Sequence, residues 1–157
     1  MKTRLILSAA ALAALPFAMP AAADDGGRPI NVAMTGAAER PGPGDPDGTG
    51  TADIRVEPAN GRLCWRLFAQ QIDPATAAHI HRGAAGTAGP PVVTLTPPAA
   101  DGRSEGCAPI DPALAAELTL RGHDFYLNVH NSAFPAGAIR GQLRGGPSRP
   151  ARLPNGR

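Results

Sequence analysis

The chain has 157 residues, a formal net charge of +2 and 18% charged residues. Lys2 and Arg4 account for the whole excess of positive charge, because the other 13 basic residues, all arginines, balance 13 acidic ones. A protein that binds nucleic acid needs a basic surface, so this balance argues against that class of protein.

Residues 1–23 have the features of a signal peptide. A basic start precedes an apolar run over residues 5–15, and the alanines at 21–23 form a small-residue cleavage site before Asp24. We therefore expect a secreted or periplasmic protein with no membrane span once the signal is removed. The rest is long enough for one domain, which we expect over residues 24–144.

Alternating apolar and polar residues predict β-strands along most of this domain. The expected strands cover residues 29–36, 49–57, 62–70, 76–81, 92–95, 103–110, 123–131 and 138–143. Asn60-Gly61 is a hairpin signal that should join the second and third strands. Asp111 and Pro112 predict the start of a short helix over residues 113–120. The pattern favours an all-β fold, namely an antiparallel β-sandwich with Greek-key or immunoglobulin-like connections.

Cys64 and Cys107 are the only cysteines. An even number in an exported chain favours a disulfide, and both fall in expected strands; a pair of free thiols is the alternative.

Residues 145–157 are mainly Gly, Pro and Arg, and we expect a disordered tail there.

Three of the four histidines fall on strand faces opposite the aliphatic side chains. His79 and His81 lie two residues apart on one strand, and His130 lies on a later one. If the last strand is close by, the same alternation predicts one polar patch. Its members are His79, His81, Asn128, His130, Arg140 and Gln142. These side chains both donate and accept hydrogen bonds, which suits a structural network or a recognition site.

The histidines also support an alternative hypothesis, a metal site. His79 and His81 can reach one ion from a single strand face, and His130 can add a third nitrogen. Such a set suits copper or zinc with one open coordination position. A His-x-His strand motif in an exported β-sandwich resembles copper–zinc superoxide dismutase, but the resemblance covers only this motif.

Three motifs, in this order, together resemble the CHRD domain. They are Ala78-His79-Ile80-His81 with the glycine-rich loop that follows, residues 126–130, and Gly137-Ala138-Ile139-Arg140-Gly141-Gln142-Leu143. The resemblance runs from about Ile30 to Leu143. CHRD domains are repeated in chordin and also occur as single-domain exported bacterial proteins, so the resemblance implies a secreted, β-rich binding module. Ala138 departs from the pattern at a position that is often acidic, which argues against a bound cation there.

The sequence contains neither a Gly-x-Ser-x-Gly nor a His-Glu-x-x-His motif. We therefore expect a non-enzymatic binding or interaction module without a cofactor, which acts as a monomer on a protein or cell-envelope ligand. The alternative is a copper- or zinc-binding protein, either metal-handling or superoxide-dismutase-like, with His79, His81 and His130 as ligands. A structural envelope protein is a third hypothesis.

Overall fold

The structure, a computed structural model, describes residues 29–144. The expected signal peptide and C-terminal tail lie outside this range. The strands are β1 (Ile30–Thr35), β2 (Thr49–Glu57), β3 (Arg62–Gln70), β4 (Ala75–Arg82), β5 (Pro91–Leu95), β6 (Arg103–Pro109), β7 (Phe125–Asn131) and β8 (Ile139–Gln142). The helix α1 spans Pro112–Leu120, and the short 3-10 helices are η1 (Gly36–Ala38), η2 (Pro58–Asn60) and η3 (Gly122–Asp124).

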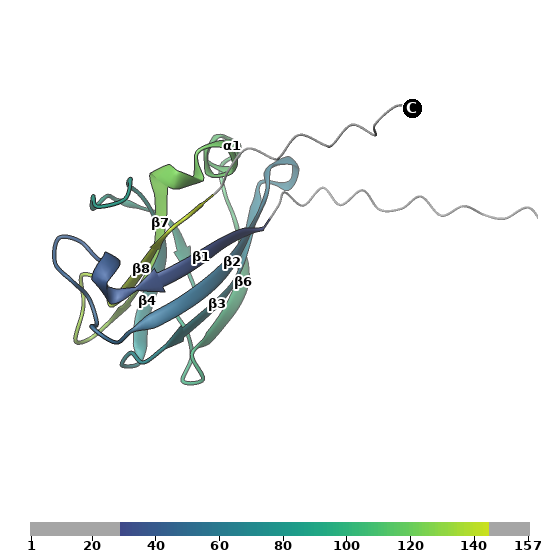
Figure 1. Cartoon of the computed structure of the whole chain (residues 1–157). Helices are drawn as coiled ribbons and strands as arrows, with labels where there is room; N and C mark the ends of the chain where they lie inside the picture. Colours follow the sequence, from purple (N-terminus) through teal and green to yellow (C-terminus); the bar gives the residue numbers. More distant parts are fainter. Residues whose placement is uncertain (1–28, 145–157) are drawn as a thin grey trace, which may run out of the picture.

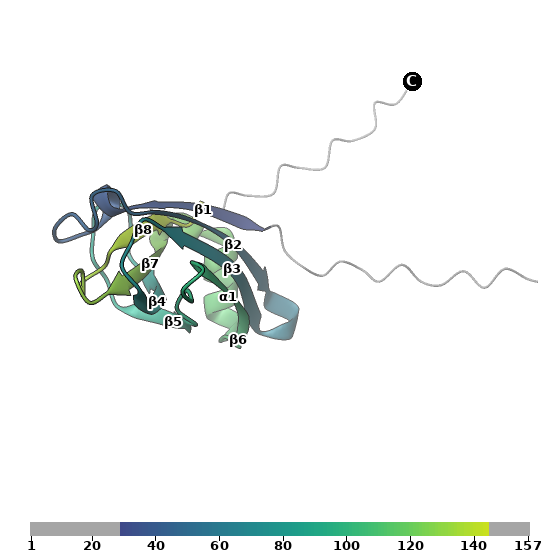
Figure 2. The same ribbon diagram turned by 90° about the horizontal axis from the view of Figure 1, so that it is seen from below.

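All eight strands belong to one antiparallel sheet with the order β5-β4-β7-β8-β1-β2-β3-β6. The sheet curls until it is nearly a barrel, and the edge strands β5 and β6 come into contact (Figures 1 and 2). They do not pair as neighbouring strands; instead, Oγ of Ser104 on β6 donates to the carbonyl of Thr96, just after β5, at 2.6 Å. The predicted all-β, antiparallel fold with one short helix is confirmed. The sandwich with Greek-key or immunoglobulin-like connections is not confirmed, because the strands form one continuous sheet.

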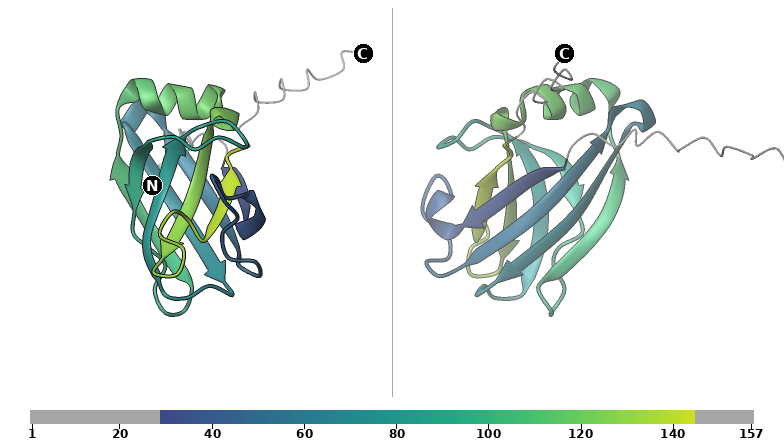
Figure 3. Two further views of the ribbon diagram at one scale, coloured as in Figure 1. Left: turned by 90° about the vertical axis from the view of Figure 1, so that its left-hand side faces the viewer. Right: turned by 45° about the vertical axis from the view of Figure 1, so that its right-hand side comes forward.

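Alternate side chains fill the inside of the curled sheet. On β1, Ile30, Val32 and Met34 are buried while the residues between them are exposed, as period-two alternation requires. The helix α1 covers one end of the sheet (Figure 3), where its Ala115 and Leu118 are fully buried. No helix within residues 29–144 is both long enough and apolar enough to span a membrane.

The disulfide prediction is confirmed. Cys64 on β3 and Cys107 on β6 lie directly opposite one another and are bonded. The bond therefore ties an edge strand to its one neighbour in the sheet.

The strand β7 is buried on both of its faces. Phe125, Leu127 and Val129 face the core, but Tyr126 and Asn128, on the outer side, are also buried. The β4–β5 loop (residues 83–90) folds back over this outer side and hydrogen-bonds to it. The local fold thus places a layer of polar side chains beneath a loop instead of in open solvent.

Candidate metal centre

The predicted polar residues lie on three neighbouring strands, β4, β7 and β8. In the register of β4 and β7, His79 lies opposite Asn128, and His81 lies opposite Tyr126. On the other side of β7, Asn128 lies opposite Arg140. We call this outer surface the polar face; its residues are His79, His81, Tyr126, Asn128, His130, Arg140 and Gln142. Tyr126 is the one member that the sequence analysis did not assign to a site, although strand alternation places it there.

His79, His81 and His130 form a compact group, the histidine cluster. One ring nitrogen of each lies within 4.8 Å of those of the other two. Nδ1 of His79 is 3.1 Å from Nε2 of His130. Two nitrogens in a tetrahedral zinc site are roughly 3.3 Å apart, because each metal–nitrogen bond is about 2.0–2.1 Å long. Small side-chain rotations would therefore bring the three nitrogens to a common ion.

Backbone carbonyls fix the proton position on two of the three rings. Nδ1 of His81 lies 2.8 Å from the carbonyl of Gly89, and Nδ1 of His130 lies 3.0 Å from the carbonyl of Pro135. A carbonyl only accepts hydrogen bonds, so in both rings Nδ1 carries the proton and Nε2 keeps its lone pair. Histidines that bind metals have this same arrangement around their second nitrogen.

Burial favours the neutral forms of His79 and His130. It lowers the pKa of His79, and the neighbouring rings of His130 and His81 lower that pKa further. Burial also lowers the pKa of His130, while the hydrogen bond to the Pro135 carbonyl partly opposes this effect. A neutral imidazole is the form that binds a metal ion.

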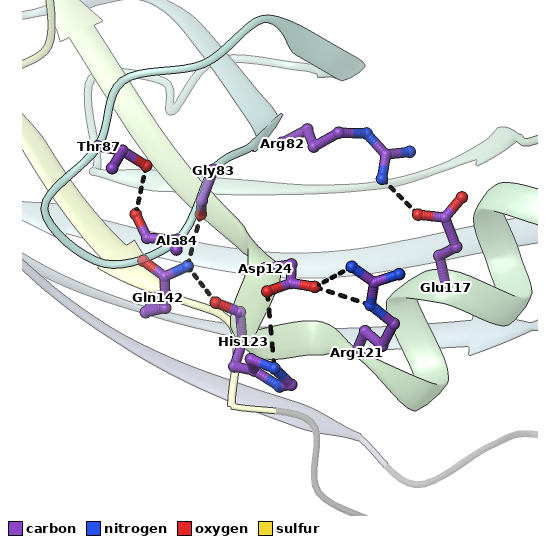
Figure 4. A network of polar contacts seen from close by, with 9 residues as sticks. All are labelled: Arg82, Gly83, Ala84, Thr87, Glu117, Arg121, His123, Asp124 and Gln142. Carbon is purple, nitrogen blue, oxygen red and sulfur yellow. Dashed lines mark hydrogen bonds and ion pairs between the residues drawn. The ribbon is translucent and has the colours of Figure 1, made fainter.

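Arg140 and Gln142 hold the β4–β5 loop over the polar face. Nη2 of Arg140 donates to the carbonyl of Ala84 at 3.1 Å. Nε2 of Gln142 donates to the carbonyls of Gly83 and His123, each at 2.7 Å, and Figure 4 shows this amide between them. Of the six predicted patch residues, these two bind the start of the loop and His81 binds Gly89 near its end, while the three histidines gather beside Asn128.

Aromatic stacking joins the two halves of the polar face. The ring of His81 stacks on that of Tyr126, with centroids 4.8 Å apart and an angle of 9° between the planes. The guanidinium carbon of Arg140 lies 3.4 Å from the centroid of Tyr126, a cation–π contact. The hydroxyl of Tyr126 accepts a hydrogen bond from the backbone of Gly89 at 3.2 Å. His81, Tyr126 and the loop are thus fixed relative to one another.

Comparison with models of protein families gives a match to the CHRD domain over residues 30–143. The chain belongs to the CHRD family. The match extends from β1 to just after β8 and so contains the whole polar face, and the resemblance drawn from the sequence motifs is confirmed. Neither the curated proteins nor the solved structures contain a significant match.

Four buried side-chain atoms in the described part of this CHRD domain have no hydrogen-bond partner. They are Oε1 of Glu39, Nε2 of His81, Oδ1 of Asn128 and Nη1 of Arg140. Three belong to the polar face. Buried polar atoms in native proteins nearly always have partners, so a group of exceptions in one place requires an explanation.

Glu39 is the fourth of these residues and packs against the same region. Its side chain is only 2% exposed. Burial raises its pKa to about 7, although hydrogen bonds from the Arg40 backbone and the Asn128 side chain, and the charge of Arg140, act in the opposite direction. The sequence analysis did not identify Glu39 as a site residue. Glu39 lies in the Pro- and Gly-rich segment 37–48, which has no alternating pattern from which burial could be predicted.

Proposed function

We propose that this CHRD domain is an exported, non-enzymatic binding module whose polar face binds one copper or zinc ion through His79, His81 and His130. The convergence of the three ring nitrogens within 4.8 Å supports this function. Imidazole nitrogens suit zinc or copper rather than calcium or magnesium, which prefer oxygen ligands.

The unpartnered nitrogen of His81 favours a metal over a purely structural hydrogen-bond network. From the sequence we expected the network as the main use of these residues. In such a network each buried ring would find a donor and an acceptor, because an unmade hydrogen bond costs roughly 1–3 kcal/mol. Nε2 of His81 is buried and has no partner, while Nδ1 of the same ring is held in place. A bound cation would satisfy the free lone pair.

The test is a metal titration of the domain that starts at Asp24, first stripped with a chelator. Isothermal titration with Zn²⁺ and Cu²⁺ should give one ion per chain. The variants His79→Ala and His130→Ala should each lose at least about 100-fold in affinity, because two imidazoles hold an ion far less well than three.

His123 provides a matched control for these variants. It is the fourth histidine and is not a member of the cluster. Its side chain is largely exposed, and its imidazole lies 3.6 Å from a carboxylate oxygen of Asp124 (Figure 4). His123→Ala should bind Zn²⁺ as the parent domain does. The proposal fails if the parent takes up no ion, or if His123→Ala loses as much affinity as His79→Ala.

A further inference from the structure

We propose that Oδ1 of Asn128 is the fourth ligand of this metal ion, so that the site is built from three imidazole nitrogens and one amide oxygen. The inference rests on the proposed metal-binding function and adds a ligand to it. It follows from the position of Asn128, from the state of its amide oxygen and from the direction in which that amide faces.

The position of Asn128 is at the centre of the polar face. It lies directly opposite His79, and residues paired in this way have Cβ atoms about 4.5–5.5 Å apart. On its own strand, His130 is two residues further along and projects from the same face at a distance of roughly 6.6–6.8 Å. His81 is the next residue of β4 on that face. Asn128 therefore has members of the histidine cluster on two sides.

The amide oxygen of Asn128 is buried and free of hydrogen bonds. The residue is 2% exposed, and its Oδ1 has no partner. Nε2 of His81 is in the same state, so two buried lone pairs without a donor lie on one small surface. A single cation bound between them would satisfy both.

The direction of the amide follows from its interaction with Glu39. The side chain of Asn128 forms a hydrogen bond with that of Glu39, and in such a pair the amide nitrogen donates and the carboxylate accepts. The amide nitrogen therefore faces Glu39, and Oδ1, on the opposite side of the amide carbon, faces away from it. Arg140 lies opposite Asn128 on β8 but makes no hydrogen bond to Oδ1 in the described chain. The inference places the oxygen on the β4 side, where His79 lies opposite Asn128.

Glu39 then acts as a positioning residue that orients the amide without touching the ion. Partners in this second layer hold a ligand in place, and their loss weakens metal binding. An amide oxygen is also a harder ligand than a thiolate or a thioether, so the completed set suits Zn²⁺ or Cu²⁺ better than Cu⁺.

The decisive experiment compares Asn128→Leu with the parent domain. Leucine has nearly the same shape as asparagine but offers no lone pair. We expect Asn128→Leu to bind Zn²⁺ about 10–100-fold more weakly. We also expect the visible absorption spectrum of the Co²⁺-loaded protein to change, because water replaces the amide oxygen. Asn31→Leu, on an exposed position of β1, is the matched control and should leave both measurements unchanged.

The outcomes separate this inference from the proposed function. If the parent binds Zn²⁺ and Asn128→Leu matches it in affinity and Co²⁺ spectrum, Asn128 is not a ligand, although the histidine site stands. If the parent and His79→Ala both bind no ion, the proposed function itself has failed. Should Asn128→Leu not fold, Asn128→Asp keeps an oxygen at the same place; it should still bind Zn²⁺ but give a shifted Co²⁺ spectrum. An unchanged spectrum in that variant would overturn the inference.

Discussion

Removal of the disulfide should lower the free energy of unfolding by about 4 kcal/mol. Cys64 and Cys107 are 43 residues apart in the sequence. In the chain-entropy model, a cross-link that closes a loop of this size stabilises the folded state by roughly 4 kcal/mol, because it restricts the unfolded chain. The bond also connects the edge strand β6 to β3, so its loss should loosen that edge first.

Urea denaturation of the Cys64→Ala/Cys107→Ala variant, with and without reductant, measures this contribution. In a separate thermal unfolding experiment, the melting temperature of the variant should be lower than that of the parent by roughly 12–20 °C, given the usual entropy of unfolding of a domain of this size. The reduced parent should match the variant, and reductant should not affect the variant itself. A loss below about 1 kcal/mol would refute the reasoning, because it would mean that the unfolded chain is not restricted as the loop model assumes.

Three further substitutions test local features. Hydrogen bonds from Asn60 and Arg62 lower the pKa of Glu57. Its stabilising effect should therefore be present above the ordinary pKa of 4.5 and disappear as the pH falls through the lower folded value, so urea unfolding should show Glu57→Gln less stable than the parent at neutral pH only. Asp111→Ala removes the N-cap of α1 and should cost about 1 kcal/mol by the same assay. Gly89→Ala should lower the melting temperature and the Zn²⁺ affinity, because the added Cβ would lie 1.7 Å from a backbone oxygen of β4.

The individual strands could be predicted because alternation reports burial on one face. The expected ranges 49–57 and 62–70 coincide with β2 and β3, since Asn60-Gly61 marks the turn between them. The pairing of strands distant in sequence could not be predicted in this way. The residue pattern within β4 or within β7 does not indicate that these two strands are neighbours. Nor does any local pattern indicate that β1 pairs with β8, the pairing that joins all the strands into one sheet.

In the candidate site, too, the features set by strand alternation could be predicted, and those set by contacts between distant segments could not. Alternation placed His79, His81 and His130 on the polar sides of their strands, and the order of strands then brought them together. Whether they bind a metal stays a prediction. Glu39 could not be found, because its burial depends on a loop that packs against the turn before β8: a Cβ on Gly137 would lie 2.3 Å from Oε1 of Glu39.

The burial of the polar face is the strongest reason to connect it with function. Period-two alternation predicts that the outer residues of β7 and β8 are exposed to solvent. Instead, Asn128 and Arg140 are each 2% exposed and Tyr126 is 3% exposed. Removing such groups from water is unfavourable unless every polar atom finds a partner, and a low-dielectric environment strengthens both the bonds that are made and the penalty for those that are not.

Stability alone gives no reason for this arrangement. Threonine and valine at these positions would maintain the strands and bury no charge, so a sheet selected only for stability has no need of Arg140 or of three clustered histidines. Local rules of protein structure are most often broken where a protein binds or reacts. Here the breaks coincide: three of the four buried atoms without partners in the described chain, the buried guanidinium and the histidine cluster all lie on β4, β7 and β8. A bound metal ion would account for two of those atoms, Nε2 of His81 and Oδ1 of Asn128, at once.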